Sequence, residues 1–148
     1  MPVNPDLAGR SYPPAPPYRV DRERVRQFAD AVFSTSPLSR DVDAARAAGY
    51  ADLVAPPTFA VVVQQGAWDQ LMGDDDAGIE LSRVLHGEQR FTQSRPIVAG
   101  DELTAALTVT GIRSVGGNTM VTAETVVSDA DGAHVVTATS LLMVGADA

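Results

Sequence analysis

The sequence contains no cysteine, which excludes disulfides and thiolate metal sites. It also contains no lysine, so all 11 basic residues are arginines. The only histidines are His86 and His134, and neither is followed by a metal-ligand spacing, so we predict no metal and no other cofactor. No apolar stretch reaches the roughly 18 residues that span a bilayer. The first residues also lack the basic segment and apolar run of an export signal, and we therefore expect a cytoplasmic location without membrane contact.

Acidic charge is in excess and unevenly distributed along the chain. Residues 1–50 hold seven arginines and six acidic residues, whereas the remaining residues carry a net charge of −9, for a total of −8. An acidic surface repels phosphate backbones, so nucleic acid is not an expected partner. The acidic run at residues 74–76 could bind a cation, but a charge run that ends a helix is usually solvated.

The 148 residues suit one globular domain over residues 1–148, since 45% are hydrophobic and 20% charged. Residues 1–17 form a proline-rich leader that is expected to be extended and to stay out of any central strand. A short strand at residues 18–20 and a helix capped by Asp21 follow. One buried stripe is predicted on that helix, at Val25, Phe28, Ala29, Val32 and Phe33.

A second, short helix is predicted from Asp41 or Val42 through Ala48, with Gly49 as a left-handed cap. A much longer apolar helix begins at Pro57 and ends near Gly73. This helix is apolar around most of its circumference, which is typical of a buried helix. We expect its core residues to include Phe59, Val62 and Val63.

After residue 78 the hydrophobic period changes from helical to alternating. Strands are predicted near residues 80–94, 102–114, 119–128 and 133–144. Turn signals at residues 116–118 and 129–132 indicate hairpins, and residues 96–101 form the remaining connection. The pattern predicts an α+β protein in which an antiparallel meander wraps around one long buried helix.

Three stretches of the sequence carry a family resemblance. GRSYPPAPPYRVDRERVRQFADAV, DLVAPPTFAVVV and VLHGEQRFTQSRPIVAGDELT together resemble the MaoC-like hydratase/dehydratase family, and in particular short actinobacterial members similar to subunits of (3R)-hydroxyacyl-ACP dehydratase. The resemblance covers residues from about 8 to 144 and implies a single hotdog fold. It implies the addition of water to a 2-enoyl thioester, or its removal from an (R)-3-hydroxyacyl thioester, with the acyl group on ACP or coenzyme A.

The loop that carries catalysis in this family departs from the family pattern. Active members resemble one another in the order aromatic, x, Gly, Asp, x, Asn, Pro, aliphatic, His, where Asp and His form the acid/base pair. Aligned on its proline, the present loop has Ser34 at the Asp, Ser36 at the Asn and Ser39 at the His. A serine hydroxyl has no proton affinity near neutral pH, so we expect no catalytic residue here.

The start of the long helix is the expected substrate-binding segment. Free backbone N–H groups at a helix start can donate to a thioester oxygen that gains charge during the reaction. The resemblance and this argument indicate substrate binding by Val54, Ala55, Pro56 and Thr58, with the amides of Ala55 and Thr58 as donors. His86 lies in a structural strand motif of the family and is interpreted as packed or hydrogen-bonded, and His134 as a surface residue.

Three hypotheses for function follow. The first is a non-catalytic subunit that pairs with an active hotdog chain and forms part of its acyl channel. The second is an active hydratase or dehydratase with unconventional residues. The third is an acyl-thioester-binding or thioesterase-like homodimer, for which Asp41 and Asp43 are the candidate carboxylates.

Overall fold

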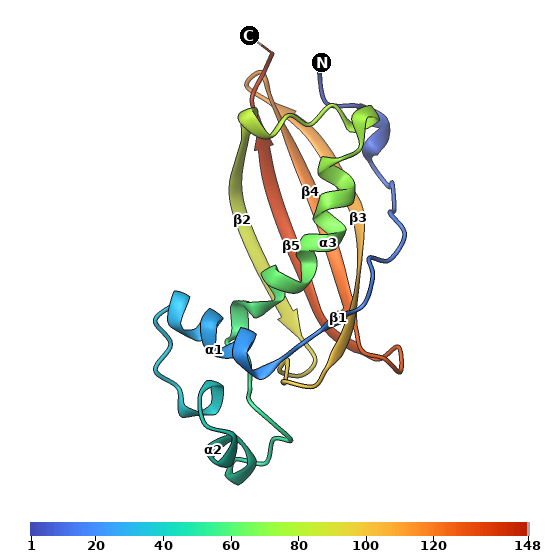
Figure 1. Cartoon of the computed structure of the whole chain (residues 1–148). Coiled ribbons are helices and arrows are strands. Elements are labelled where there is room, and N and C mark those ends of the chain that lie inside the picture. The colour runs from blue at the N-terminus through green and yellow to red at the C-terminus, as the bar shows by residue number, and fades with distance from the viewer. Residues whose placement is uncertain (148) are drawn as a thin grey trace.

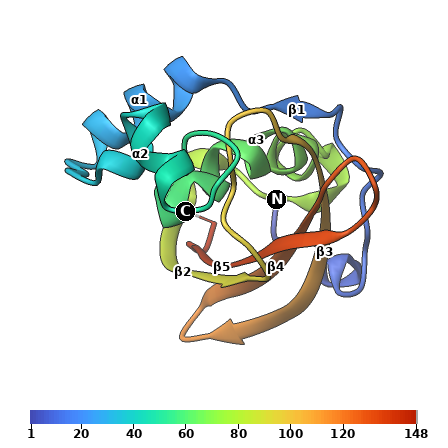
Figure 2. The same ribbon diagram turned by 90° about the horizontal axis from the view of Figure 1, so that it is seen from below.

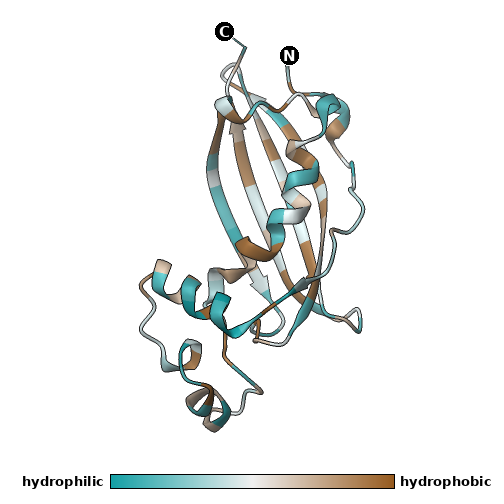
Figure 3. Cartoon of the chain, in the orientation of Figure 1, coloured by the Kyte–Doolittle hydropathy of each residue, from teal (hydrophilic) through white to brown (hydrophobic). Residues whose placement is uncertain are grey.

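A curved five-stranded antiparallel sheet dominates the computed structural model, which describes residues 1–147. The strand order is β1-β3-β4-β5-β2 (Figure 1). Apolar and polar bands alternate along the strands (Figure 3), as expected for a sheet with one buried face. The strands are β1 (Tyr18–Arg19), β2 (Val84–Gln93), β3 (Glu102–Val115), β4 (Asn118–Ser128) and β5 (His134–Val144).

The longest helix, α3 (Ala60–Met72), lies across the concave face of this sheet (Figure 2). A short 3₁₀ turn, Pro57–Phe59, leads into it, and Gly73 ends it as predicted. The sheet wrapped around one helix confirms the predicted hotdog fold. Neither α3 nor any other helix within residues 1–147 is long and apolar enough to cross a membrane.

The order of the strands corrects the predicted meander. Strands β3, β4 and β5 follow one another as hairpins, and Gly116 and Gly117 form the first turn with φ of 58° and 82°. Strand β2, however, pairs with β5 and not with β3, so the segment after Gln93 crosses to the other side of the sheet. Strand β2 also starts later than predicted, because residues 81–83 form a 3₁₀ turn.

The proline-rich leader runs along the outer edge of β3. The amides of Gly9, Tyr12 and Ala15 donate to β3 carbonyls at 2.8–2.9 Å, and β1 continues this pairing at Glu102 and Leu103. The leader thus stays at an edge, as predicted, and covers β3 from residue 102 to 109. Strand β2 is the other edge of the sheet, and within residues 1–147 it has no strand on its outer side.

Two short helices, α1 (Arg22–Ala31) and α2 (Val42–Ala47), project beyond one end of the sheet (Figure 1). Asp21 caps α1 as predicted, because its side chain accepts from the Arg24 amide at 2.8 Å. The predicted stripe is wrong at its end, where the helix stops at Ala31. Val25 and Ala29 are buried, but Val32 is 42% exposed and Phe33 is 89% exposed.

The packing of α3 also differs from the expectation in one place. Phe59 and Val63 lie in the core as predicted, with 0% and 4% exposure. Val62 is only half-buried, since it packs against the core and also lines a pocket, so it lies at the margin of the core and not within it. Gln65 and Asp69 are exposed and bonded to each other at 2.8 Å, which leaves one polar face on this helix.

Candidate functional site

The loop after α1 and the start of the α3 segment meet at one pocket of about 220 Å³. The pocket brings together the three serines of the loop after α1 and residues 54–56 of the predicted binding segment, although 15 to 22 positions separate them in sequence. Thr58 is exposed and does not line it. The lining residues are Ser34, Ser36, Leu38, Ser39, Val54, Ala55, Pro56, Pro57, Gln93 and Pro96.

Ser39, which aligns on Pro37 with the histidine of the family motif, makes a buried hydrogen bond to the backbone. Its side chain is 3% exposed, and its hydroxyl donates to the Val54 carbonyl oxygen at 2.6 Å. The Val54 amide in turn donates to the Leu38 carbonyl at 2.8 Å. Ser39 therefore fastens its loop to the segment before α3, and its proton is engaged with a group that cannot take it.

The turn before Ser34 keeps an unusual backbone. Aligned on Pro37, the glycine of the family motif falls on Phe33, which has a φ of 57°. This left-handed conformation is costly for a side chain larger than glycine. Arg40 holds the turn, since it donates twice to the Ser34 carbonyl oxygen and once to Asp30. The backbone is thus in a conformation that favours glycine, although the residue is an exposed phenylalanine.

The backbone donors differ from the expectation. The Ala55 amide donates to the Ile97 carbonyl at 2.8 Å, so its predicted role as a free donor is wrong. The Phe59 amide donates to the Pro56 carbonyl oxygen, and Pro56 and Pro57 have no N–H. Among the amides of residues 55–59, that of Thr58 is the one without an acceptor within the described chain.

Gln93 and Pro96 line the pocket and were not predicted. Gln93 ends β2, and its side-chain amide donates to the Pro57 carbonyl oxygen at 3.2 Å. It therefore ties the end of β2 to the start of α3. No local signal marks this contact, because the two residues lie 36 positions apart.

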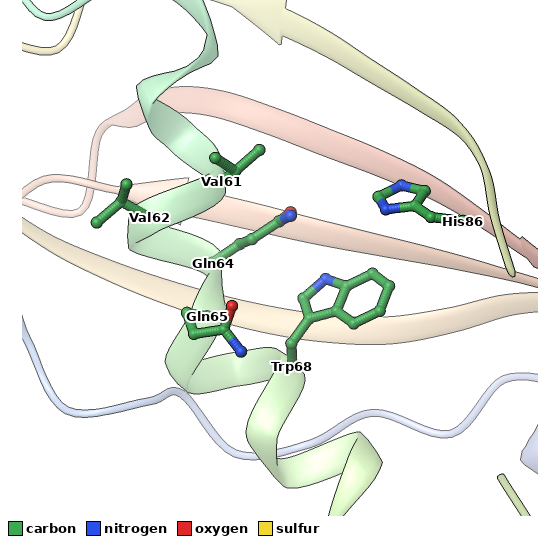
Figure 4. Close-up of a pocket in the computed structure, with 6 residues that line it drawn as sticks. All are labelled: Val61, Val62, Gln64, Gln65, Trp68 and His86. Carbon is green, nitrogen blue, oxygen red and sulfur yellow. The ribbon is translucent and has the colours of Figure 1, made fainter. Parts of the chain in front are cut away.

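A larger pocket, of about 540 Å³, lies between α3 and β2 and was also not predicted. It is lined by Val61, Val62, Gln64, Gln65, Trp68 and His86 (Figure 4). The ring of His86 stacks on that of Trp68 with centroids 5.9 Å apart, and its Nε2 bonds the Glu88 carbonyl at 3.1 Å. The hydrogen-bonded role predicted for His86 is thus confirmed.

The other candidate groups lie outside both pockets. His134 is exposed, as predicted, and its ring bonds the hydroxyls of Ser94 and Thr137. Asp41 caps α2 by accepting from the Asp43 amide, and neither carboxylate lines a pocket with the serines.

Within the acidic run after α3, Asp74 is half-buried and paired, which corrects the expectation for this residue, whereas Asp75 and Asp76 are exposed as expected. Asp74 accepts from the Tyr12 hydroxyl at 2.6 Å and from Arg10 at 2.9 Å, and Arg10 also bonds Asp76. The Tyr12 hydroxyl, together with Arg10, lowers the pKa of Asp74. Burial is the main cause that raises the pKa of Tyr12 to about 12, and the hydrogen bond to Asp74 adds to it. This cluster fastens the leader to the end of α3.

Comparisons with known proteins agree with this fold. The family model described as the FAS1-like dehydratase domain region matches residues 6–138, and the chain belongs to this family. Among its relatives are UPF0336 proteins. That of Leifsonia xyli is 61% identical and that of Clavibacter michiganensis 60%, each over 99% of both chains.

Solved structures place the same fold among dehydratases. A MaoC-like dehydratase superposes with a TM-score of 0.85 and 34% identity over 95% of this chain, but over only 42% of its own length. The HadBC (3R)-hydroxyacyl-ACP dehydratase complex of Mycobacterium tuberculosis matches with a TM-score of 0.81 and 30% identity, over 93% of this chain and 97% of that one. The MaoC-like hydratase/dehydratase fold predicted from the sequence is thereby confirmed.

Proposed function

We propose that this chain is a non-catalytic subunit of a (3R)-hydroxyacyl-thioester dehydratase or enoyl hydratase. It pairs with a hotdog chain that carries the Asp/His pair and supplies part of the wall of the acyl channel. The observation that carries the proposal is the state of the catalytic loop. Ser34 and Ser39 occupy the acid/base positions, and the Ser39 hydroxyl is buried against the Val54 carbonyl. Proton transfer at neutral pH needs a group that titrates near that pH, which a serine does not.

The lack of a nearby base supports the same assignment. Neither histidine lines the serine pocket, and the pocket's lining residues include no carboxylate. The loop is nevertheless held in a defined conformation, with a left-handed turn at Phe33 and the Ser39 hydroxyl bonded to the Val54 carbonyl. An ordered loop without an acid/base pair fits a subunit that shapes a channel.

The edges of the sheet support pairing through β2. The leader covers β3, whereas β2 exposes its backbone edge and Leu85, which is 63% exposed. An uncovered edge strand is a template for pairing with another chain. The segment that follows α1 lies on the side of the molecule where β2 lies (Figures 1 and 2), and this segment contains Phe33, which is 89% exposed. These surfaces together form a candidate pairing face.

The similar structures also favour a two-domain assembly. The matched subunit of Mycobacterium tuberculosis belongs to a HadBC complex. In the longer MaoC-like dehydratase, the unmatched part of the chain is large enough for a second domain of this size. In such an assembly, one domain can supply the catalytic residues while the other forms part of the binding surface.

Co-expression with a hotdog chain from the same organism that has an intact Asp and His loop tests this proposal. We expect the two chains to purify as one complex that hydrates crotonyl-CoA. The present chain alone should have negligible activity, since loss of each acid/base group costs about 10² to 10⁴ in rate.

The matched control replaces the partner's Asp by Asn in the complex, which should abolish turnover without separating the chains. Turnover by the present chain alone within about tenfold of an intact complex would overturn the proposal.

A further inference from the structure

The larger pocket is lined by both apolar and polar side chains. Val61 and Val62 of α3 form part of its lining, beside Gln64 and Trp68 (Figure 4). Gln64 is unusual, because it is 94% buried although it carries a primary amide. A buried amide is costly unless both its oxygen and its nitrogen find partners.

Hydrogen bonds behind Gln64 fix the direction of its amide. The Gln89 side-chain nitrogen donates to the Thr139 carbonyl oxygen at 3.2 Å, so the Gln89 Oε1 must face Ser140 and Gln64. This oxygen accepts from the Ser140 hydroxyl at 2.7 Å and from the Gln64 Nε2 at 3.5 Å. The remaining atom, Gln64 Oε1, is an acceptor without a donor among residues 1–147.

Trp68 adds an unpaired donor one helical turn away. Its Nε1 is buried and has no acceptor among residues 1–147. Residues four positions apart lie on the same face of a helix, so this donor and the Gln64 acceptor belong to the same wall. The His86 ring stacks on the indole. One hydroxyl group satisfies both atoms, because its proton can go to Gln64 Oε1 while its oxygen accepts from Trp68 Nε1.

The two pockets follow one another along α3. Gln93 contacts Pro57, Gln89 contacts Gln64, and His86 contacts Trp68, so β2 runs beside the helix in the opposite direction. At a rise of about 1.5 Å per residue, the 11 residues from Pro57 to Trp68 correspond to about 16 Å. This length is comparable to that of an acyl chain of medium length.

We propose that the Gln64–Trp68 wall binds a hydroxyl group carried by the acyl chain at a distance from its thioester. This inference rests on the proposed function, because it takes the two pockets beside α3 as parts of one acyl channel. The substrate class is thus a hydroxylated acyl thioester of medium length, in preference to a plain alkyl chain of the same length. A plain chain leaves both buried groups unpaired, which a site built around hydrogen bonds penalises.

The wall contains its own reporter, since Trp68 is the only tryptophan. The purified chain is titrated with ω-hydroxydecanoyl-CoA and ω-hydroxydodecanoyl-CoA, and with the plain decanoyl and dodecanoyl thioesters. Binding is followed by Trp68 fluorescence and by calorimetry. We expect at least one hydroxylated ligand to shift the fluorescence and to bind about tenfold more tightly than its plain counterpart, the change that one net hydrogen bond gives.

Three variants test the assignment. Gln64→Leu should remove the preference for the hydroxylated ligand and improve binding of the plain chain. Gln70→Leu is the matched control on the same helix, because Gln70 lies outside the pocket and bonds the Pro13 carbonyl. Trp68→Phe keeps a stacking ring without the N–H, and should reduce the preference by calorimetry even if Gln64→Leu does not fold.

Equal binding of hydroxylated and plain chains, no binding of either, or a preference that survives both Gln64→Leu and Trp68→Phe would overturn the inference. Its failure is distinguishable from that of the proposed function. An active complex without hydroxyl preference contradicts only the inference. A preference that depends on Gln64, in a chain that forms no complex with an Asp/His subunit, contradicts only the pairing.

Discussion

Phe33 combines two features that fold stability alone does not favour. Its backbone is left-handed, and its ring is 89% exposed, so the chain has the cost of the conformation without the benefit of burial. Backbone strain that the surroundings hold in place tends to occur at functional sites. Arg40 and Asp30 provide such surroundings here.

We predict that Phe33→Gly stabilises the isolated chain by about 0.5–1 kcal/mol, because glycine relieves the left-handed strain but gains freedom in the unfolded state. The same change should weaken pairing with the catalytic subunit. Phe33→Ala is the control, since it removes the ring and keeps the strain. Denaturant titration and sedimentation of the mixed chains measure the two effects, and unchanged pairing in both variants would refute the contact role.

Tyr12 and Asp74 predict a pH dependence of stability. Because the folded pKa of Asp74 is lowered, its contribution is complete above its ordinary value of 3.8 and is lost as the pH falls through the folded value. The pKa of Tyr12 is raised from 10.0 to about 12, so its contribution holds below pH 10 and is lost as the pH rises through about 12.

Tyr12→Phe should therefore lower the free energy of unfolding at neutral pH by about 1.5–3 kcal/mol, the range for a hydrogen bond to a charged group. The difference from the unmodified chain should shrink below pH 3.8. Urea titrations at several pH values measure this. Tyr50→Phe is the control, because the Tyr50 hydroxyl makes no hydrogen bond within residues 1–147. A constant difference down to pH 2 would count against the role of Asp74.

At the scale of elements, β2 is an edge strand, and no other strand within residues 1–147 covers its outer side. Burial alternates clearly along β3, β4 and β5, whereas most of β2 is exposed. We predict that Leu85→Glu raises the dissociation constant of the subunit pair at least about tenfold, through lost apolar contact and a charge at the seam. Val115→Glu, at the hairpin between β3 and β4, is the matched control. Equal effects of the two changes in sedimentation would show that β2 is not the seam.

The sequence predicted elements well where the signal was local. Alternation located β3, β4 and β5, the two glycines located their hairpin, and Asp21 located a helix start. The partner of β2 could not be predicted, because pairing across the sheet has no local pattern. The buried stripe of α1 was predicted two residues too far, to Val32 and Phe33. The apolar spacing continues at these positions, although the helix ends at Ala31.

At the scale of the whole molecule, the family loop located the serine pocket, but periodicity did not find the second one. Ser34 and Ser39 do meet the Val54–Pro56 segment, as the resemblance implied, while their lack of catalysis stays a prediction. The Gln64, Gln89 and Ser140 network spans more than 70 positions and was not foreseeable. Two adjacent glutamines and the single tryptophan on an apolar helix were the available signal.

The leader along β3 limits how far this chain can extend a sheet by edge pairing. A sheet with two open edges is a bifunctional monomer, which can propagate without limit. With residues 9–15 hydrogen-bonded along β3, this chain becomes monofunctional, and β2 is its one reactive end. Such a unit terminates growth at the first addition. The leader therefore corresponds to an end-capping group, and we predict that edge pairing through β2 stops at two chains.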